Sequence, residues 1–394
     1  MTAAGEAPAP APPPRLSAVG VVAHPDGGSQ VGIIAKRTYR VVGQRCVVDD
    51  EQIPLVEVQR FSDDKSALLH DFDAVLNRTE VDVVVEGSAR PPRPGATSFE
   101  LRVRVAHLDR KLMVWGDRRC YRDAGGRLRF SAPNPVESVP LDWTTSYGGV
   151  DEVALARHGD PMREMRAAAK IPYSPRFGRF SYPRNRAGRG YLIEATNEAL
   201  EACALPNVEE PLQPLSPETL AVGVFDRWPK APSVGAVGWL SYTNFPRAAM
   251  LGLTSPYNDV ACPALTFFEV KIGAVKADSI AHAMAFEKRL DRRVAQQSAL
   301  GMRVASVAPG APVSVVNAHP KLTSWDFTLS YDSPLLALQM PGTQSVAVEA
   351  KIRTVFLQPD RDRVSIVWVG EHREPTPVGP GKKALIKHAV QWRG

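Results

Sequence analysis

Alternating hydrophobic and polar positions predict β-strands from the start of the chain. Residues 31–42 are rich in β-branched side chains and partly alternate, and residues 43–44 can turn them into a second strand over residues 45–48. Residues 81–89 form another β-branched run, which a turn rich in proline and glycine follows. This part of the chain therefore predicts a hairpin and then a further strand.

The clearest hairpin pattern comes next. Residues 98–108 place apolar side chains on one face and charged side chains on the other, which is typical of a half-buried strand. Residues 111–115 return after a predicted turn at residues 109–110. Residues 119–121 and 128–130 flank a Gly-Gly pair, which predicts a second hairpin.

The C-terminal third combines predicted strands with helices. Residues 345–357 and 363–369 alternate and predict two strands. Residues 278–300 carry apolar side chains at a spacing of four and end at a glycine, so they predict the one long helix. Residues 382–392 predict a short basic helix.

Regular patterns are scarce between residues 131 and 240, where prolines and glycines are dense. Residues 160–170 and 196–204 predict short helices within this stretch. A connection this long without periodicity is typical of a functional surface or of packed irregular structure.

These elements predict a mainly β fold of the β-rich α+β kind. We expect antiparallel sheets in a sandwich or open barrel, with long irregular loops and one long helix. Residues 1–14 are rich in alanine and proline and predict a disordered tail. Residues 15–230 form a predicted β-rich domain, loop-rich from residue 131, and residues 231–394 form a C-terminal β-rich part whose strands can share a sheet with it.

The composition is ordinary for a soluble globular protein. The 394-residue chain is 44% apolar and 23% charged, and its 35 prolines and 29 glycines suit strands and turns. No stretch approaches the roughly 18 apolar residues that a membrane span requires, and no secretory signal pattern is present. A net charge of +6 from 48 basic and 42 acidic residues is weak evidence for polyanion binding. We therefore predict a cytoplasmic protein.

Residue types that bind metals occur without the spacing of a metal site. The cysteines are far apart and form no C-x-x-C pair, so we expect buried, reduced thiols at Cys46, Cys120, Cys203 and Cys262. Residues 70–73 place a histidine beside two aspartates, but adjacency alone supplies no third ligand, and we interpret them as a solvated loop. We expect no metal and no cofactor.

Two segments stand out from the loop-rich region. Residues 185–191 contain two glycines two positions apart beside Asn185, which indicates a tight turn in which the asparagine bonds the neighbouring backbone. Residues 205–211 bracket two glutamates with prolines and predict a stiff, exposed acidic strip. Neither segment has the glycine spacing of a phosphate-binding loop.

The segment 163–191 is basic and interleaved with aromatic residues. Arginines with aromatics suit a protein interface, where both are favoured anchors. The same composition is compatible with a structural loop clamped by ion pairs, or with single-stranded nucleic acid bound by charge and stacking.

Several segments, taken in order, resemble a bacterial family of unknown function encoded in type VI secretion clusters beside PAAR-like spike proteins and their effectors. The resemblance spans most of residues 30–370. The matching segments are Ala35-Lys36-Arg37-Thr38-Tyr39, Asp73 with residues 82–89, Gly116-Asp117-Arg118, Pro140-Leu141, Tyr147-Gly148-Gly149, residues 185–191, residues 205–211, Trp228-Pro229, and Thr354-Val355-Phe356 with Ser365-Ile366-Val367-Trp368.

The resemblance implies an accessory protein, an adaptor or chaperone that helps to load a spike-tip effector, with no established enzymatic chemistry. We accordingly expect no catalytic residues and a protein partner. The alternatives are nucleic-acid binding by residues 163–191 and a hydrolase with its active site in the long loops. The expected partner-binding residues are Arg176, Arg179, Asn185, Arg186, Arg189, Tyr191, Asn207, Glu209 and Glu210. The expected structural residues are Asp82, Gly87, Gly116, Asp117, Arg118, Tyr147, Gly148, Gly149, Gly188, Gly190, Trp228 and Trp368.

Overall fold

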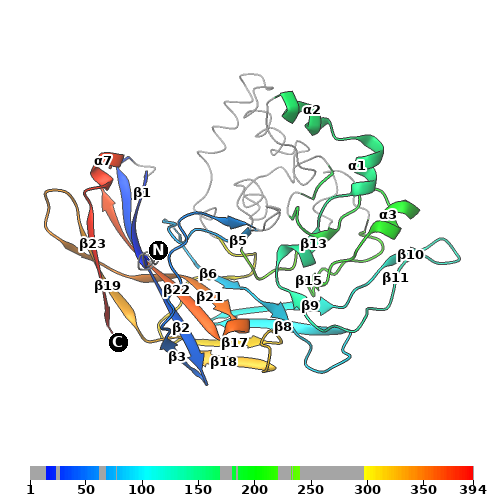
Figure 1. Cartoon of the computed structure of the whole chain (residues 1–394), viewed down its shortest axis with the longest axis horizontal. Coiled ribbons are helices and arrows are strands. Elements are labelled where there is room, and N and C mark those ends of the chain that lie inside the picture. The colour runs from blue at the N-terminus through cyan, green and yellow to red at the C-terminus, as the bar shows by residue number, and fades with distance from the viewer. Residues whose placement is uncertain are drawn as a thin grey trace, which may run out of the picture.

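A large, curled, mixed sheet dominates the computed structural model (Figure 1). The residues that the structure describes are 15–23, 27–61, 68–76, 78–168, 180–182, 185–220, 232, 234–239 and 297–393. Within them the sheet has twelve strands, so the predicted mainly β fold is confirmed. The strand order is β15 (Val208–Glu209), β9 (Leu108–Trp115), β8 (Ser98–Val105), β17 (Pro312–Val316), β18 (Ser324–Thr328), β3 (Arg45–Val48), β2 (Ser29–Val42), β22 (Arg363–Glu374), β21 (Lys351–Gln358), β6 (Val81–Val85) and β16 (Arg303–Val304), with β1 (Ser17–Ala23) also paired to β2.

Strands from both ends of the chain alternate within this sheet. β2 pairs antiparallel with β22 from Ser29↔Glu374 to Arg40↔Arg363. β21 pairs parallel with β6, and β18 pairs parallel with β3, so the sheet is mixed and not antiparallel throughout as predicted. A domain division near residue 230 stays a prediction, but strands from both sides of it share this one sheet.

The predicted hairpins are present, with one turn displaced. The pairs β2–β3 and β8–β9 form as the alternation indicates. The second pair turns at Ala106 and His107 and not at residues 109–110, since Arg104 pairs with Asp109. Ala106 takes a positive φ of 51°. The sequence does not predict this turn, because glycine and asparagine are the residues that usually adopt such a φ.

A second, three-stranded sheet forms a sandwich with one end of the large sheet. Its order is β20 (Val346–Val348), β19 (Ser333–Gln339) and β23 (Lys387–Arg393). Leu336 and Leu338 of β19 pack on Val31 and Ile33 of β2. The prediction of a basic helix over residues 382–392 is wrong, because a short helix, α7 (Pro380–Lys383), precedes a strand.

The other described elements lie mainly at the opposite end of the molecule from the three-stranded sheet (Figure 1). They include the predicted hairpin at residues 119–130 and both predicted short helices. The short strands are β4 (Arg60–Phe61), β5 (Leu68–His70), β7 (Ser88–Ala89), β10 (Cys120–Arg122), β11 (Leu128–Phe130), β12 (Val139–Pro140), β13 (Tyr147–Gly148) and β14 (Arg189–Gly190); the helices are η1 (Trp143–Thr145), α1 (Glu152–His158), α2 (Pro161–Ala168), α3 (Asn197–Ala202) and η6 (Pro359–Arg361).

The predicted long helix lies mostly outside the described residues, as does the tail 1–14. The described end, residues 297–300, is not helical, because Ser298 pairs with Trp239 as an isolated antiparallel bridge. The predicted helix end at residue 300 is therefore wrong. None of the described helices has the length and apolarity that crossing a bilayer requires.

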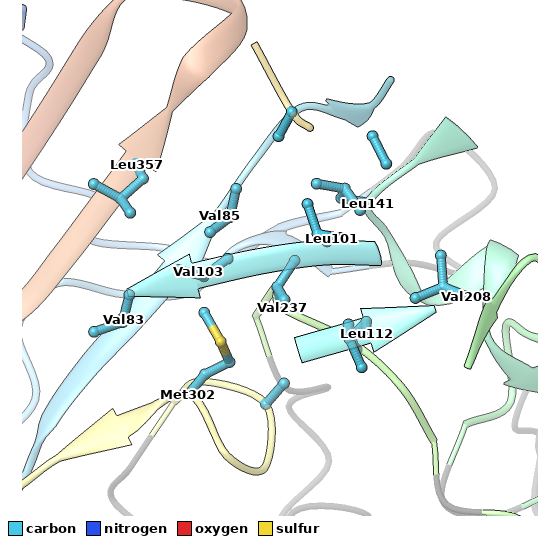
Figure 2. Close-up of a cluster of buried hydrophobic side chains, with 14 of the residues drawn as sticks. Val83, Val85, Leu101, Val103, Leu112, Leu141, Val208, Val237, Met302 and Leu357 are labelled. Atoms are coloured by element: carbon cyan, nitrogen blue, oxygen red, sulfur yellow. The ribbon is translucent and has the colours of Figure 1, made fainter. Parts of the chain in front are cut away.

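The largest core lies on one face of the curled sheet. Val83 and Val85 of β6, Leu101 and Val103 of β8, and Leu112 of β9 gather there with Leu357 of β21 (Figure 2). Backbone bonds from Val83 N–H to Met302 and from Val85 N–H to Val237 bring two later segments alongside β6. Three described cysteines, Cys46, Cys120 and Cys203, carry free thiols, and Cys262 lies outside the described residues.

Candidate functional site

The two segments singled out in the sequence meet a third segment and form one unit, which we call the three-loop clamp. It consists of residues 143–149, 185–191 and 205–210. Tyr147 and Gly148 of β13 pair in parallel with Arg189 and Gly190 of β14. The third segment joins through Asn207, whose N–H donates to the carbonyl of Thr145 over 2.8 Å.

Glycines allow the loops of the clamp to approach each other. Gly148 and Gly149 have φ values of 148° and 99°, and Gly190 has a φ of 93°. A Cβ added to Gly149 or to Gly188 would lie within 3.0 Å of backbone oxygen in the facing loop. Both the conformation and the close approach therefore require glycine.

Side-chain amides and a guanidinium hold the loops in place. Asn185 Nδ2 donates to the carbonyls of Trp143 and Tyr147, over 2.7 and 3.1 Å, and its Oδ1 accepts from Ala187 N–H. Arg189 donates to the carbonyl of Thr144 over 2.9 Å and to Asn207 Oδ1 over 3.0 Å. The prediction that Asn185 bonds the neighbouring backbone in a tight turn is confirmed.

Aromatic rings fill the interior of the clamp. The rings of Tyr147 and Tyr182 lie edge to face with centroids 5.1 Å apart, and Tyr182 lies 5.3 Å from Tyr191. All three side chains are buried. Burial raises the pKa of Tyr147 well above its ordinary value, so this phenol stays protonated.

A buried ion pair joins the third loop to the sheet. Arg118 binds the Glu209 carboxylate and donates to the carbonyl of Pro206 over 2.7 Å, and its guanidinium lies 4.9 Å from the Trp115 ring. Burial raises the pKa of Glu209, and Arg118 acts against that rise. Asn207 Nδ2 donates to the Asp117 carboxylate over 3.0 Å, so this loop is bonded on both sides.

The prediction of an exposed acidic strip is wrong for Glu209, which is 3% exposed. Asn185, Tyr191 and Asn207 are buried as well, with side chains that pack within the protein, and their role in partner binding stays a prediction. The half-buried Glu210 pairs with Arg110, which reaches its Oε2 over 2.9 Å. Of the other predicted site residues, Arg186 and Arg189 are half-buried. Arg176, Arg179 and Trp228 lie outside the described residues.

The clamp ends in an exposed turn. Residues 211–214, Pro-Leu-Gln-Pro, follow Glu210 directly, and Leu212 is 94% exposed. Gln213 N–H donates to the Glu210 carbonyl over 3.2 Å, and Leu215 is buried again. The clamp thus holds an apolar side chain in solvent.

A profile of one protein family covers most of the chain. The family is described as an uncharacterized protein conserved in bacteria (DUF2169), and its model matches residues 26–369. The chain belongs to this family. No curated protein and no solved structure matches the chain significantly.

The DUF2169 match also covers a second group of functional-type side chains, which the sequence interpretation missed. Across one face of the large sheet, Lys36, Val367, Thr354, Asp82 and Arg303 stand opposite one another on five consecutive strands. We call Lys36, Thr354, Asp82 and Arg303 the polar row. Such a row is invisible in the sequence, because strand order and register create it.

Residues 70–73 cover one end of the polar row, so the prediction of a solvated loop there is wrong. Asp73 Oδ2 accepts from Lys36 Nζ over 2.8 Å, and both side chains are 1% exposed. His70 packs against Trp239 and Phe356, with ring centroids 4.6 and 5.1 Å away. Burial lowers the pKa of His70, which keeps this imidazole neutral near pH 7.

The motif residue Asp82 lies next to Arg303, which is the other end of the polar row. Its Oδ1 accepts from Ser298 Oγ over 2.7 Å and from Ser298 N–H, and its Oδ2 accepts from Gln297 N–H. The buried Arg78 donates to Thr354 over 2.7 Å and lies 3.4 Å from Asp82. Asp82 therefore anchors a distant segment and has a structural role in this family member.

The remaining motif residues also support the framework. Gly116 lies against the Asn134 backbone, and the Gly87 carbonyl accepts from Leu141 N–H over 2.9 Å. Trp368 is buried, with its ring 5.1 Å from that of Trp392. Among the described residues, no group of three or more His, Cys, Asp or Glu side chains has the geometry to hold a metal ion.

Replacing Arg118 with methionine is expected to lower the free energy of unfolding by about 3 kcal/mol at pH 7, because the buried Glu209 carboxylate loses its partner. Without Arg118 the folded-state pKa of Glu209 rises further above its unfolded value. Stability from this group is then present at low pH and lost as the pH rises through the folded pKa. The difference in the free energy of unfolding between the wild type and the variant should therefore become smaller as the pH falls. Urea denaturation at pH 7 and at pH 5 measures this difference.

The exposed pair between Arg102 and Asp109 provides the control. Replacing Arg102 with methionine should lower the free energy of unfolding much less than the Arg118 change does, since solvent screens this pair. The role given to Arg118 would be contradicted if the two variants lost equal free energy of unfolding. It would also be contradicted if the loss in the Arg118 variant were the same at both pH values.

Proposed function

We propose that this DUF2169 protein is an accessory protein that recognises another protein. Its role is that of an adaptor or chaperone, which acts by binding and not by catalysis and loads a PAAR-like spike-tip effector of a type VI secretion system. The order of its sequence motifs, from Lys36 to Trp368, supports the secretion context by resemblance. The observation that carries the binding role is the exposed turn at residues 211–214.

This turn has the properties of an anchor for a partner. A leucine that is 94% exposed gains hydrophobic free energy when a pocket on another protein covers it. The prolines at positions 211 and 214 restrict the backbone on both sides of it. A preformed turn loses little conformational entropy on binding, which favours affinity.

The clamp explains why this turn keeps its place. Glu210, next to the turn, is fixed by Arg110, and Leu215 at the other end is buried. Bonds from Arg189 and Asn207 join the same loop to the other two loops of the clamp. The buried motif residues therefore contribute to recognition indirectly, by holding the turn that a partner would contact.

The nucleic-acid alternative needs exposed aromatic side chains on which bases can stack. Within the described part of residues 163–191, Phe180, Tyr182 and Tyr191 are buried and pack on other side chains of the protein. This placement favours a protein partner over single-stranded nucleic acid.

Replacing Leu212 with aspartate is expected to reduce capture of the partner at least tenfold, because the variant places a charge in an apolar pocket. The assay is a pull-down with the tagged full-length protein, and the prey is a purified PAAR-like spike-tip protein or its effector from the same bacterium. Leu385, 62% exposed in the turn after α7, is the matched control, and its change to aspartate should leave capture unchanged.

The outcomes separate the site from the function. If the wild-type protein captures neither prey protein, the adaptor role is contradicted. If it captures one and the Leu212 variant captures it equally well, the adaptor role stands and the turn at residues 211–214 is the wrong site.

A further inference from the structure

Two buried cysteines lie opposite each other where α3 meets the β10–β11 hairpin. Arg119 and Ala204 form an isolated antiparallel bridge. In an antiparallel register the residue after one partner stands opposite the residue before the other, so Cys120 stands opposite Cys203. Residues 120 and 203 therefore lie side by side, although 82 residues separate them in the chain.

The register also places the two side chains on the same face. Opposite residues of an antiparallel pair have Cβ atoms about 4.5–5.5 Å apart. A disulfide spans Cβ atoms about 3.5–4.5 Å apart and Cα atoms about 4.4–6.8 Å apart, so a small adjustment suffices. Both thiols are buried in the main core and free in the structure. Burial is the larger cause of the raised pKa of Cys203, and Cys120 is close enough to raise that pKa further.

We propose that Cys120 and Cys203 are a redox-convertible pair, two thiols under reducing conditions and one disulfide under oxidising conditions. The oxidant is a small-molecule disulfide such as oxidised glutathione. One cysteine thiolate attacks it, forming a mixed disulfide and releasing one glutathione thiol. The second cysteine then attacks the mixed disulfide, releasing the second glutathione, so two protein thiols become one disulfide and one oxidised glutathione becomes two reduced molecules.

The bond would close a loop around the clamp. Residues 121–202 carry β11, the three helices α1 to α3 and two of the three loops of the clamp. A disulfide at its ends would join this segment between the end of β9 and the start of β15, two strands that are paired in the large sheet. Because the crosslink restricts the unfolded chain, the oxidised protein should unfold at a higher temperature.

Burial also determines how fast the pair reacts. It raises the pKa of Cys203 to about 12 and that of Cys120 above its ordinary value, so few thiolates exist at neutral pH. Oxidation should therefore proceed through local opening, over hours and not seconds. The same burial should protect the disulfide, once formed, from reductants.

The test uses the full chain with Cys46 and Cys262 replaced by serine, which leaves Cys120 and Cys203 as its two cysteines. The protein is equilibrated with dithiothreitol or with excess oxidised glutathione. It is then denatured, and its free thiols are alkylated and counted by intact mass. We expect two alkylated thiols after reduction, none after oxidation, and a higher melting temperature for the oxidised protein.

Other results distinguish real pairing from chance. The single variants Cys120→Ser and Cys203→Ser, in the same background, should each keep one thiol or one glutathione adduct and show no rise in melting temperature. Two free thiols, two glutathione adducts, or a crosslink that forms between chains or only in urea would overturn the proposal. A peptide map that joins the peptides of residues 120 and 203 would support it.

Discussion

Replacing Lys36 with methionine is expected to lower the free energy of unfolding by about 4 kcal/mol. Methionine matches the length of lysine but leaves the Asp73 carboxylate without its cation in a site that is 1% exposed. Urea denaturation followed by tryptophan fluorescence measures the loss. This is one of the two largest effects that we expect, because few charges in the described chain are so completely removed from water.

The bonds around this pair explain the size of the effect. Lys36 Nζ also donates to the carbonyl of Pro54 over 3.3 Å, and Asp73 Oδ2 also accepts from Val56 N–H over 2.8 Å. Lys36 thus holds two covering segments, residues 54–56 and 73, on the sheet. The variant disturbs both segments at once.

Two controls separate the buried charge from general damage. The double variant Lys36→Met, Asp73→Asn removes the charge and keeps an oxygen for Val56 N–H, so it should recover most of the loss. Replacing Arg15, whose pair with Glu57 is about half exposed, should cost less than about 1 kcal/mol. A single Lys36 variant as stable as the Arg15 variant would show that the pair contributes little.

Local patterns predicted the hairpins because their interactions are local. Alternation over residues 98–115 determines which face of β8 and β9 is buried, and the two strands are neighbours in the chain. The parallel pairing of β21 with β6 could not be predicted, since it joins segments about 270 residues apart. The predicted helix at residues 382–392 failed for the same reason, because pairing with β19 makes Lys387–Arg393 a strand.

The polar row shows why charged residues mislead a sequence interpretation. Lys36 and Asp73 look like surface residues in the sequence, where such types are mostly exposed. Only the register across β2, β22, β21 and β6 brings Lys36 and Asp82 into one row. Only the segments that cover this row exclude its side chains from water. The sequence signal was the position of Lys36 directly after the apolar residues 31–35, in a segment that predicts a strand.

The sequence predicted the tight turn of the clamp but not the burial of its side chains. The spacing of Gly188 and Gly190 indicated a tight turn, which the structure confirms. The burial of Tyr191 and Glu209 depends on loops that come from up to about 90 residues away, such as the one carrying Arg118. A short motif of polar and aromatic residues therefore identifies a structured turn but does not say whether that turn faces solvent or the core.

Gly149 is a position in the clamp where an added side chain would be strongly destabilising. Its φ is 99°, which side chains rarely adopt, and an added Cβ would lie within 3.0 Å of the Gly188 carbonyl oxygen. The opposing atoms are backbone and cannot rotate away. Its own N–H and C=O bond to the Asn185 carbonyl and to Tyr182 N–H, over 2.8 Å each, so the loop cannot shift without breaking them.

Replacing Gly149 with alanine is expected to cost about 4 kcal/mol or to prevent folding, because strain, overlap and lost hydrogen bonds act together. Gly126 is the matched control: its φ is 75°, but no atom lies within 4 Å of an added Cβ. Its change to alanine should cost about 1 kcal/mol through conformation alone. Denaturation of both variants measures the difference, which we attribute to contact between the loops. Equal losses would mean that the clamp loops are not packed against each other as described.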